Sequence, residues 1–372
     1  MRTKTTEDYS MMYPDIMAYS GQTALVRLTS LSAEATSVSL SISIGGTTYT
    51  EQRTPINGAV TFDIARYMRL GFTRASVEYE LTVTTPRLAP ASTSHTVTCG
   101  VSITYSGESV VHAGNFDIIA LYGTLGLGRS NGGTRRRTWF VNYPFSLDLY
   151  VTDTSAITLE YGDGTSEVFS NTATASPQHV TVDMRAENLD VPPQAHKARL
   201  VATNTQYLNN ALSGASSAVR SGSTTYELDI DRSSCGTLLR WIDDVGQWAY
   251  YLLRATGRSY NVAQAQSWEV GGLVQSIGAE RNVMNTVGSL AQQQLNATET
   301  VSLGAKLVDG DTLDLLLTLA ASPVVEALVY KNADDSVWER VAVTAASYTR
   351  TNDNLQDFTV AVQRATTKTQ ML

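Results

Sequence analysis

The most constraining feature of this sequence is an alternation of apolar and small polar residues that runs through its first hundred positions. The apolar members of its first part are Ala24, Val26, Leu28, Val38, Leu40, Ile42 and Ile44. A period of two puts one face of a strand in a core and the other in water. The pattern returns over residues 75–84 and 94–105. We therefore predict an antiparallel β-sandwich over residues 1–105, with a brief helix at 64–69 that Asp63 could cap.

The composition agrees with a chain that is mainly β. Serine and threonine together supply 82 of the 372 residues, whereas charged residues make up only 17%. Threonine favours strands, and small hydroxyl side chains suit a sheet face that is half exposed. The length predicts two or three domains, and a hydrophobic content of 42% is enough to build a core in each.

Short apolar runs follow at even spacing in the middle of the chain, at 145–151, 156–161, 167–169 and 179–184. Between two of them, the sequence Tyr-Gly-Asp-Gly-Thr at 161–165 predicts a tight hairpin turn, because glycine permits the positive φ that such turns require. This turn resembles the hairpin of PKD-type immunoglobulin-like domains. We predict a second antiparallel, immunoglobulin-like β-sandwich over residues 140–232.

The segment 106–139 is predicted to connect the two sandwiches. Its stretch 121–138 holds five glycines and little periodicity, which indicates a long exposed loop. Three arginines near its end, with the tryptophan that follows, form a candidate subunit interface, because arginine suits ion pairs between proteins. These residues are Arg135, Arg136, Arg137 and Trp139. A nucleic-acid contact is the weaker alternative, since the formal net charge of −8 opposes binding to phosphates.

Residues 233–372 are predicted to form a C-terminal domain of mixed β and α structure. Trp241, Trp248 and Tyr250 lie among aliphatic residues in a dense aromatic hairpin or turn, so we expect them to be structural anchors in a core or an interface. Residues 312–321 could form a helix or a buried strand. A helix is favoured, because Asp311 can cap it.

No motif in the sequence predicts catalysis, a cofactor or a metal. The four histidines never reach the spacing of a metal site, and Cys99 and Cys235 lie too far apart for a C-x-x-C pair. The glycines of 121–138 lack the lysine of a phosphate-binding loop, and no nucleophile elbow is present. Acidic clusters at 160–167 and 309–314 lack the ligand order of a calcium loop. We expect no enzyme activity, although the paired carboxylates of a glycosidase would leave no motif.

Two further expectations concern the place where the chain is made. No uninterrupted apolar stretch reaches the roughly 18 residues of a spanning helix, and no apolar segment follows the basic residues at the start. We therefore expect a soluble protein, made in a reducing cytoplasm and without a membrane partner.

Three longer segments have distinctive sequences: RTPINGAVTFDIARY at 53–67, RTWFVNYPF at 137–145 and LRWIDDVGQWAYYL at 239–252. A fourth stretch, from Ser322 to the C-terminal residues 370–372, is of the same kind. Together they resemble a family of structural proteins from bacteriophages and prophages of Bacteroides-type gut bacteria. The similarity is spread over nearly the whole chain, and none of the segments is a catalytic signature.

The resemblance implies a β-rich subunit of a phage tail, or of a ring or baseplate next to the tail. Its expected partners are copies of itself and other virion proteins, and its expected location is the virion, assembled in the bacterial host cytoplasm. The alternative is a glycan-binding or adhesion module, because 18 tyrosines and 5 tryptophans can offer flat faces to saccharides. A hydrolase is a distant third hypothesis.

Overall fold

The computed structural model describes most of the chain. The described residues are 1–14, 17–72, 88–107, 109–123, 134–151, 157–169, 178–186, 189–208, 219–270, 289–331, 336–347, 355–364 and 367–371. In these ranges the protein is mainly β, as predicted, with α1 (Ala65–Leu70) and α3 (Gly310–Ala321) as helices. Within the same ranges, no helix is long and apolar enough to cross a membrane.

The N-terminal unit consists of two sheets that enclose one hydrophobic core. The first sheet contains β1 (Arg2–Thr5), β2 (Ser10–Tyr13), β4 (Leu25–Thr29) and β7 (Val60–Asp63), in that order. The second contains β3 (Met17–Tyr19), β10 (Val110–Leu121), β9 (Ser94–Tyr105), β5 (Ala35–Ile44) and β6 (Thr47–Arg53). The alternating residues of β4 and β5 point into the shared core, as their period of two dictates.

The predicted connecting segment is wrong for two of its parts. Residues 110–121 form β10, which pairs with β9 along its whole length and contributes Phe116, Ile118 and Ala120 to the N-terminal core. Residues 134–140 form β11 (Thr134–Phe140), a strand of the second unit. Residues 124–133, which hold four of the five glycines of this stretch, lie outside the described residues.

The second unit also has two sheets. Its larger sheet contains β11, β17 (Val219–Asp231), β16 (Lys197–Leu208), β13 (Ile157–Tyr161) and β14 (Ser166–Phe169). Its smaller sheet contains β12 (Ser146–Val151), β15 (Gln178–Asp183) and β8 (Leu88–Pro90). The hairpin turn predicted at 161–165 is confirmed between β13 and β14. Since β8 precedes β9 in the chain, the N-terminal part of the sequence supplies one strand to the second unit.

The two five-stranded sheets share one strand order and are mixed rather than purely antiparallel. In the first, β3 lies parallel to β10, the last strand of its unit. In the second, β11 lies parallel to β17, again the last strand of its unit. The prediction of purely antiparallel sandwiches is wrong at these two edges. The parallel partners are about 90 to 100 residues apart in sequence, so no local pattern announces them.

The third unit is mostly β, with less helix than a mixed domain implies. Its strands are β18 (Thr237–Ile242), β19 (Trp248–Val270), β20 (Ser289–Val308), β21 (Val325–Lys331), β22 (Ser336–Arg340), β23 (Ala342–Ser347), β24 (Gln356–Gln363) and β25 (Thr367–Met371). The predicted helix is confirmed as α3, but its cap is Asp309, which accepts a hydrogen bond from the Thr312 amide at 2.8 Å. Asp311 lies in the first turn, where its carboxylate interacts favourably with the positive end of the helix dipole.

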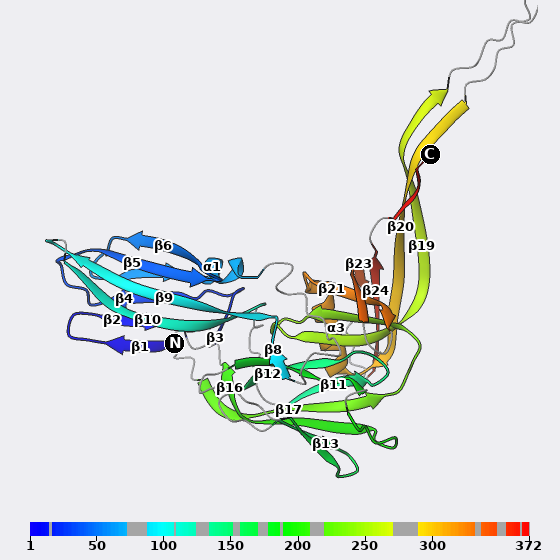
Figure 1. Cartoon of the computed structure of the whole chain (residues 1–372), viewed down its shortest axis with the longest axis horizontal. Helices are drawn as coiled ribbons and strands as arrows, with labels where there is room; N and C mark the ends of the chain where they lie inside the picture. The colour runs from blue at the N-terminus through cyan, green and yellow to red at the C-terminus, as the bar shows by residue number, and fades with distance from the viewer. Residues whose placement is uncertain are drawn as a thin grey trace, which may run out of the picture.

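A long hairpin made of β19 and β20 projects from the body (Figure 1). β19 changes partners along its length. Residues 248–253 pair with β18, whereas residues 254–270 pair with β20 on the opposite edge. Beyond the body the hairpin is a two-stranded ribbon, to which β25 adds a short third strand at residues 294–297.

Candidate functional site: a three-unit junction and a projecting hairpin

The tight turn between β18 and β19, residues 243–247, is the point where all three units meet. Asp243 closes this turn: its Oδ1 accepts hydrogen bonds from the amides of Val245 at 3.1 Å and Gln247 at 2.9 Å. Gly246 has a φ of +75°, which favours glycine. A Cβ at this position would lie 1.8 Å from the carbonyl oxygen of Tyr122. The turn is therefore fixed both by its own hydrogen bonds and by close packing against the N-terminal unit.

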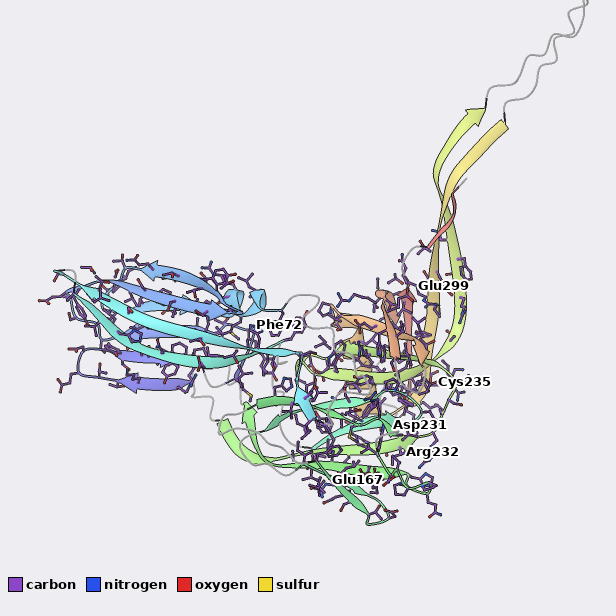
Figure 2. The ribbon with its side chains drawn as sticks, in the orientation of Figure 1. Phe72, Glu167, Asp231, Arg232, Cys235 and Glu299 are labelled. Atoms are coloured by element: carbon purple, nitrogen blue, oxygen red, sulfur yellow. The ribbon has the colours of Figure 1, made fainter. Side chains whose placement is uncertain are left out.

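The N-terminal unit contacts the turn through an apolar cluster. Val245 packs with three residues of that unit, Met17, Tyr19 and Leu121. A second contact lies nearby, where Phe72 packs against both the N-terminal core and the core of the second unit (Figure 2). These contacts bury apolar surface between the units, which is the main favourable term in such docking.

The second unit contacts the turn through polar groups. The side-chain oxygen of Gln247 accepts hydrogen bonds from the guanidinium of Arg135 and, at 2.9 Å, from the hydroxyl of Tyr226. The side-chain nitrogen of Gln247, Nε2, donates to the backbone oxygen of Asp148 at 3.0 Å. Arg137 forms an ion pair with Asp243 at 3.3 Å, in which both side chains are largely buried. Each of these polar groups is satisfied, so the network specifies one arrangement of the units.

Asp148 is the electrostatically unusual member of this network. Its carboxylate accepts from the Thr181 hydroxyl at 2.6 Å and from the Trp248 amide at 3.1 Å. Burial raises the pKa of Asp148 to about 6, against the effect of these two hydrogen bonds and with a smaller contribution from the Asp243 charge. Asp148 therefore titrates close to neutral pH inside the junction.

β18 and β19 form a wall between two hydrophobic cores. Leu238, Ile242, Trp248, Tyr250 and Leu252 face the core of the second unit. Leu239, Trp241, Ala249 and Leu253 face the core of the third unit. A strand pair that is buried on both faces needs apolar residues at nearly every position, which explains the dense aromatic segment.

The three predicted anchors are all buried in this wall. Trp241 is fully buried and donates from its indole nitrogen to the Thr318 hydroxyl of α3 at 2.8 Å. Tyr250 shares a hydrogen bond of 2.7 Å with Ser146 of β12. Trp248 packs against Arg240, whose guanidinium lies 4.8 Å from the Trp248 ring and 4.2 Å from the Trp338 ring. None of the three offers a free face to a saccharide.

Arg240 also forms a buried ion pair, which the sequence analysis did not single out. Its Nε donates to Glu326 of β21 at 2.6 Å, and both side chains are almost fully buried. The two residues are directly opposite in the β18–β21 register. A cation buried between two tryptophan rings and a carboxylate connects four strands at this position, β18, β19, β21 and β22.

The arginines predicted at a subunit interface lie on β11 and bind groups of their own chain. Arg136 forms ion pairs with Asp229 at 2.7 Å and with Asp309, the cap of α3, at 2.9 Å. Arg135 and Arg137 bind the 243–247 turn, and Trp139 is fully buried. The prediction of an exposed loop at 134–138 is therefore wrong, because these residues belong to β11. A contact between copies through this strand remains a prediction. Of the three arginines, Arg136 has the most exposed side chain and is the one best placed for such a contact.

The acidic clusters considered for calcium have other roles in the structure. Asp163 accepts two hydrogen bonds from Thr165 within its turn, and Asp309 caps α3. Among the described residues, no group of three His, Cys, Asp or Glu side chains is arranged to hold a metal ion. His95 is half-buried and His179 is buried, and desolvation lowers the pKa of His95 to about 4 and that of His179 to about 3.

No known protein family and no curated protein matches this chain. The chain is similar to a protein in the tail of an empty gene transfer agent particle with C6 symmetry, with 19% identity, a TM-score of 0.20, and coverage of 36% of this chain and 95% of that one. A bacterial ice-binding adhesin involved in host cell surface retention matches with 14% identity, a TM-score of 0.17 and coverage of 87% and 91%. The titin I-band fragment I67–I69 matches with 9% identity, a TM-score of 0.15 and coverage of 80% and 94%. At these values the comparisons assign neither a family nor a function.

Proposed function

We propose that this chain is a structural subunit of a bacteriophage or phage-like tail, or of a ring or baseplate next to it, and that it acts by assembling with copies of itself and with other virion proteins. The observation that carries the proposal is a long hairpin on a body whose three units meet at a buried turn. A two-stranded ribbon gains little stability alone in water, so a projecting ribbon of this length needs a partner surface.

The exposure and the sequence of the hairpin support the same proposal. Every residue from Arg254 to Asn261 is exposed. The sequence 262–297 contains three charged residues, Glu269, Glu280 and Arg281, in 36 positions, a lower proportion than the 17% of the whole chain. Natural proteins protect exposed strand edges with charges, and a hairpin with few charges in its outer part is suited to burial against another protein.

The shared strand order of the first two units supports an immunoglobulin-like fold for both, which we include in the proposal. In each unit the first strand of the larger sheet lies parallel to the last strand, and the next strands follow in the same order. We also propose that the protein has no catalytic activity and functions in the virion. The buried positions of Trp241, Trp248 and Tyr250 count against the alternative of a saccharide platform at these residues.

Removal of the outer part of the hairpin tests this function. Trp268 and Ala291 are cross-strand partners, so replacing residues 269–290 by Asn-Gly closes the ribbon in register and leaves the partner residues of β25 in place. We expect the full chain to form rings or tubes by negative-stain microscopy and mass photometry, and the shortened variant to lose them with an unchanged melting temperature. A full chain that stays monomeric, alone and with neighbouring virion proteins, contradicts the proposal.

A further inference from the structure

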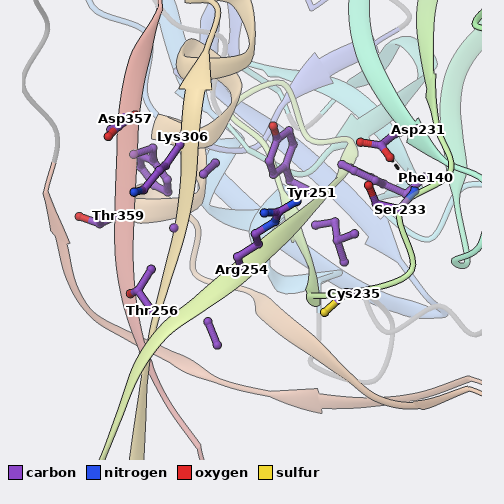
Figure 3. A pocket seen from close by; sticks show the side chains of 15 residues that line it. Phe140, Asp231, Ser233, Cys235, Tyr251, Arg254, Thr256, Lys306, Asp357 and Thr359 are labelled. Atoms are coloured by element: carbon purple, nitrogen blue, oxygen red, sulfur yellow. Dashed lines mark hydrogen bonds between the residues drawn. The ribbon is translucent and has the colours of Figure 1, made fainter.

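A pocket of about 570 Å³ at the root of the hairpin holds two carboxylates and two cations, Asp231, Asp357, Arg254 and Lys306 (Figure 3). Because these charges balance, the pocket favours neither an anion nor a cation. An ionisable side chain without such compensation lies elsewhere, at the contact between the N-terminal and second units. This side chain is His95 of β9.

His95 is part of a row of three aromatic rings that crosses this contact. Its side chain lies on the same face of β9 as that of Val97, which is fully buried in the N-terminal core. The His95 ring meets Phe72 edge-on, with 4.3 Å between the centroids, and Phe72 meets Tyr122 edge-on at 5.1 Å. Phe72 packs against the cores of both units, and Tyr122 packs against the core of the second. The three rings therefore connect the two units.

The packing around His95 accepts only a neutral ring. Both ring nitrogens are shielded from solvent, and neither has a hydrogen-bond partner in the described part of the chain. The backbone lies close to the ring, since a Cβ on Gly71 would be 2.2 Å from Nε2 of His95. A protonated imidazole has two N–H donors and a charge, so its burial here would leave both donors unsatisfied.

The charged groups on the surrounding elements do not compensate a proton on His95. The ionisable residues there are Arg69 of α1, Asp117 of β10, Tyr122, Arg340 of β22, and Asp243 and Asp244 of the turn. Asp117 is exposed and accepts from the Thr98 hydroxyl at 2.7 Å, and Asp243 is paired with Arg137. Desolvation is what lowers the pKa of His95 to about 4, with no contribution from these charges.

We propose that His95 is an acid-sensitive switch whose protonation releases the N-terminal unit from the other two units while the core of each unit stays folded. A released His95 reaches water, where its two donors are satisfied. The N-terminal core draws only on residues of its own unit, so its packing does not need the contact. The inference is independent of the proposed function.

The size of the effect follows from the two states of the ring. In the released state the pKa of His95 returns to its ordinary 6.5, against about 4 in the closed contact. Well above pH 6.5 the ring is neutral in both states, and the contact is unaffected. As the pH falls from 6.5 to 4, the released state takes up the proton first and is favoured. At pH 5 the ratio of released to closed molecules should be roughly thirty times that at pH 7.5.

A thiol placed inside the contact measures this ratio. Met17 is buried against Val245 of the turn, so the full chain with Met17→Cys and Cys235→Ser carries a thiol that reacts only when the contact opens. The probe is 4,4′-dithiodipyridine, and the same chain with His95→Phe, which keeps a ring but cannot ionise, is the reference. Comparing the two chains at one pH cancels the intrinsic reactivity of the thiol and the titration of Asp148, which is present in both.

We expect the labelling rate with His95, divided by that with His95→Phe, to rise roughly thirtyfold from pH 7.5 to pH 5. His95→Leu is a second non-ionising variant and should behave like His95→Phe. His112→Phe is the matched control, because His112 is exposed on β10, and it should keep the response of the unaltered histidine.

Cys99 distinguishes release of the unit from its unfolding, because it is fully buried in the N-terminal core and should stay unreactive at both pH values. A rate ratio that does not change with pH overturns the inference. So does labelling of Cys99 in parallel with the thiol at position 17, since the N-terminal unit would then unfold rather than separate. Loss of the pH response in His112→Phe would equally assign the effect to a group other than His95.

Discussion

Replacing Asp148 by Asn should stabilise the protein at neutral pH and remove part of its pH dependence. The folded pKa of Asp148 is raised from its ordinary 3.8 to about 6. Below pH 3.8 the group is protonated in both the folded and the unfolded states and contributes nothing. As the pH rises from 3.8 through 6, the unfolded state ionises first, and the folded state loses stability relative to it.

The magnitude follows from the shift. About two pKa units at 1.36 kcal/mol each give roughly 3 kcal/mol of destabilisation, complete above pH 6 or so. Asn cannot ionise, yet it fits the same contacts. Its oxygen can accept from the Trp248 amide, and its NH₂ group can donate to the Thr181 hydroxyl, which rotates to accept. We therefore expect a gain of about 2–3 kcal/mol at pH 7.5 and roughly half of that at pH 5.

The assay is thermal and urea unfolding of the full chain at both pH values, combined with hydrogen exchange of the Trp248 amide. Asp183→Asn is the matched control. Asp183 is equally buried but forms an ion pair with Arg185 at 2.7 Å. Removing the Asp183 charge leaves Arg185 without this partner and should destabilise the protein at both pH values. The reasoning is refuted if Asp148→Asn destabilises the protein more at pH 7.5 than at pH 5, or changes stability equally at both.

Three further changes test the junction. Gly246→Ala should lower stability by more than about 3 kcal/mol, because it combines a positive φ with a backbone clash; Gly164→Ala, at a φ of +88° in open space, should cost only about 1 kcal/mol by thermal melting. Glu326→Gln should lower the free energy of unfolding by roughly 3–5 kcal/mol, because it leaves the Arg240 cation buried without its counter-charge. Tryptophan fluorescence should report the change in packing of β18 and β19, and a loss below about 1 kcal/mol would contradict this prediction. Trp248→Ala should cost about 3–5 kcal/mol and broaden the unfolding transition, whereas an unaltered melting temperature would show that the wall does not couple the cores.

Elements that are determined by neighbouring residues in the sequence were predicted correctly. Alternation over residues 24–44 identified β4 and β5, and the glycine turn at 161–165 located one hairpin correctly. The apolar run at 312–321 correctly indicated α3. In each case the residues that decide the structure lie within a few positions of one another, so the pattern is visible in a single sequence.

The junction and the hairpin could not be predicted in the same way. Arg137 looked like part of an exposed loop because its partner, Asp243, lies 106 residues further along the chain. The 248–270 strand has no clean alternation, because its inner part is buried on both faces and residues 254–261 are exposed throughout. A strand that passes from a body into a ribbon has no constant inward face, and hydrophobic periodicity cannot detect it.

The two-sided wall of β18 and β19 also sets the order in which the chain can fold. The N-terminal core draws only on residues 9–120 and can close as soon as that part of the chain leaves the ribosome. The core of the second unit begins at Trp139 but includes Val324, with Trp338 packed against it. Its strands must therefore wait, with apolar faces uncovered, until most of the remaining chain has been made. Long-range pairing of this kind folds slowly and is open to aggregation, so this interval during synthesis is when the protein should depend most on chaperones.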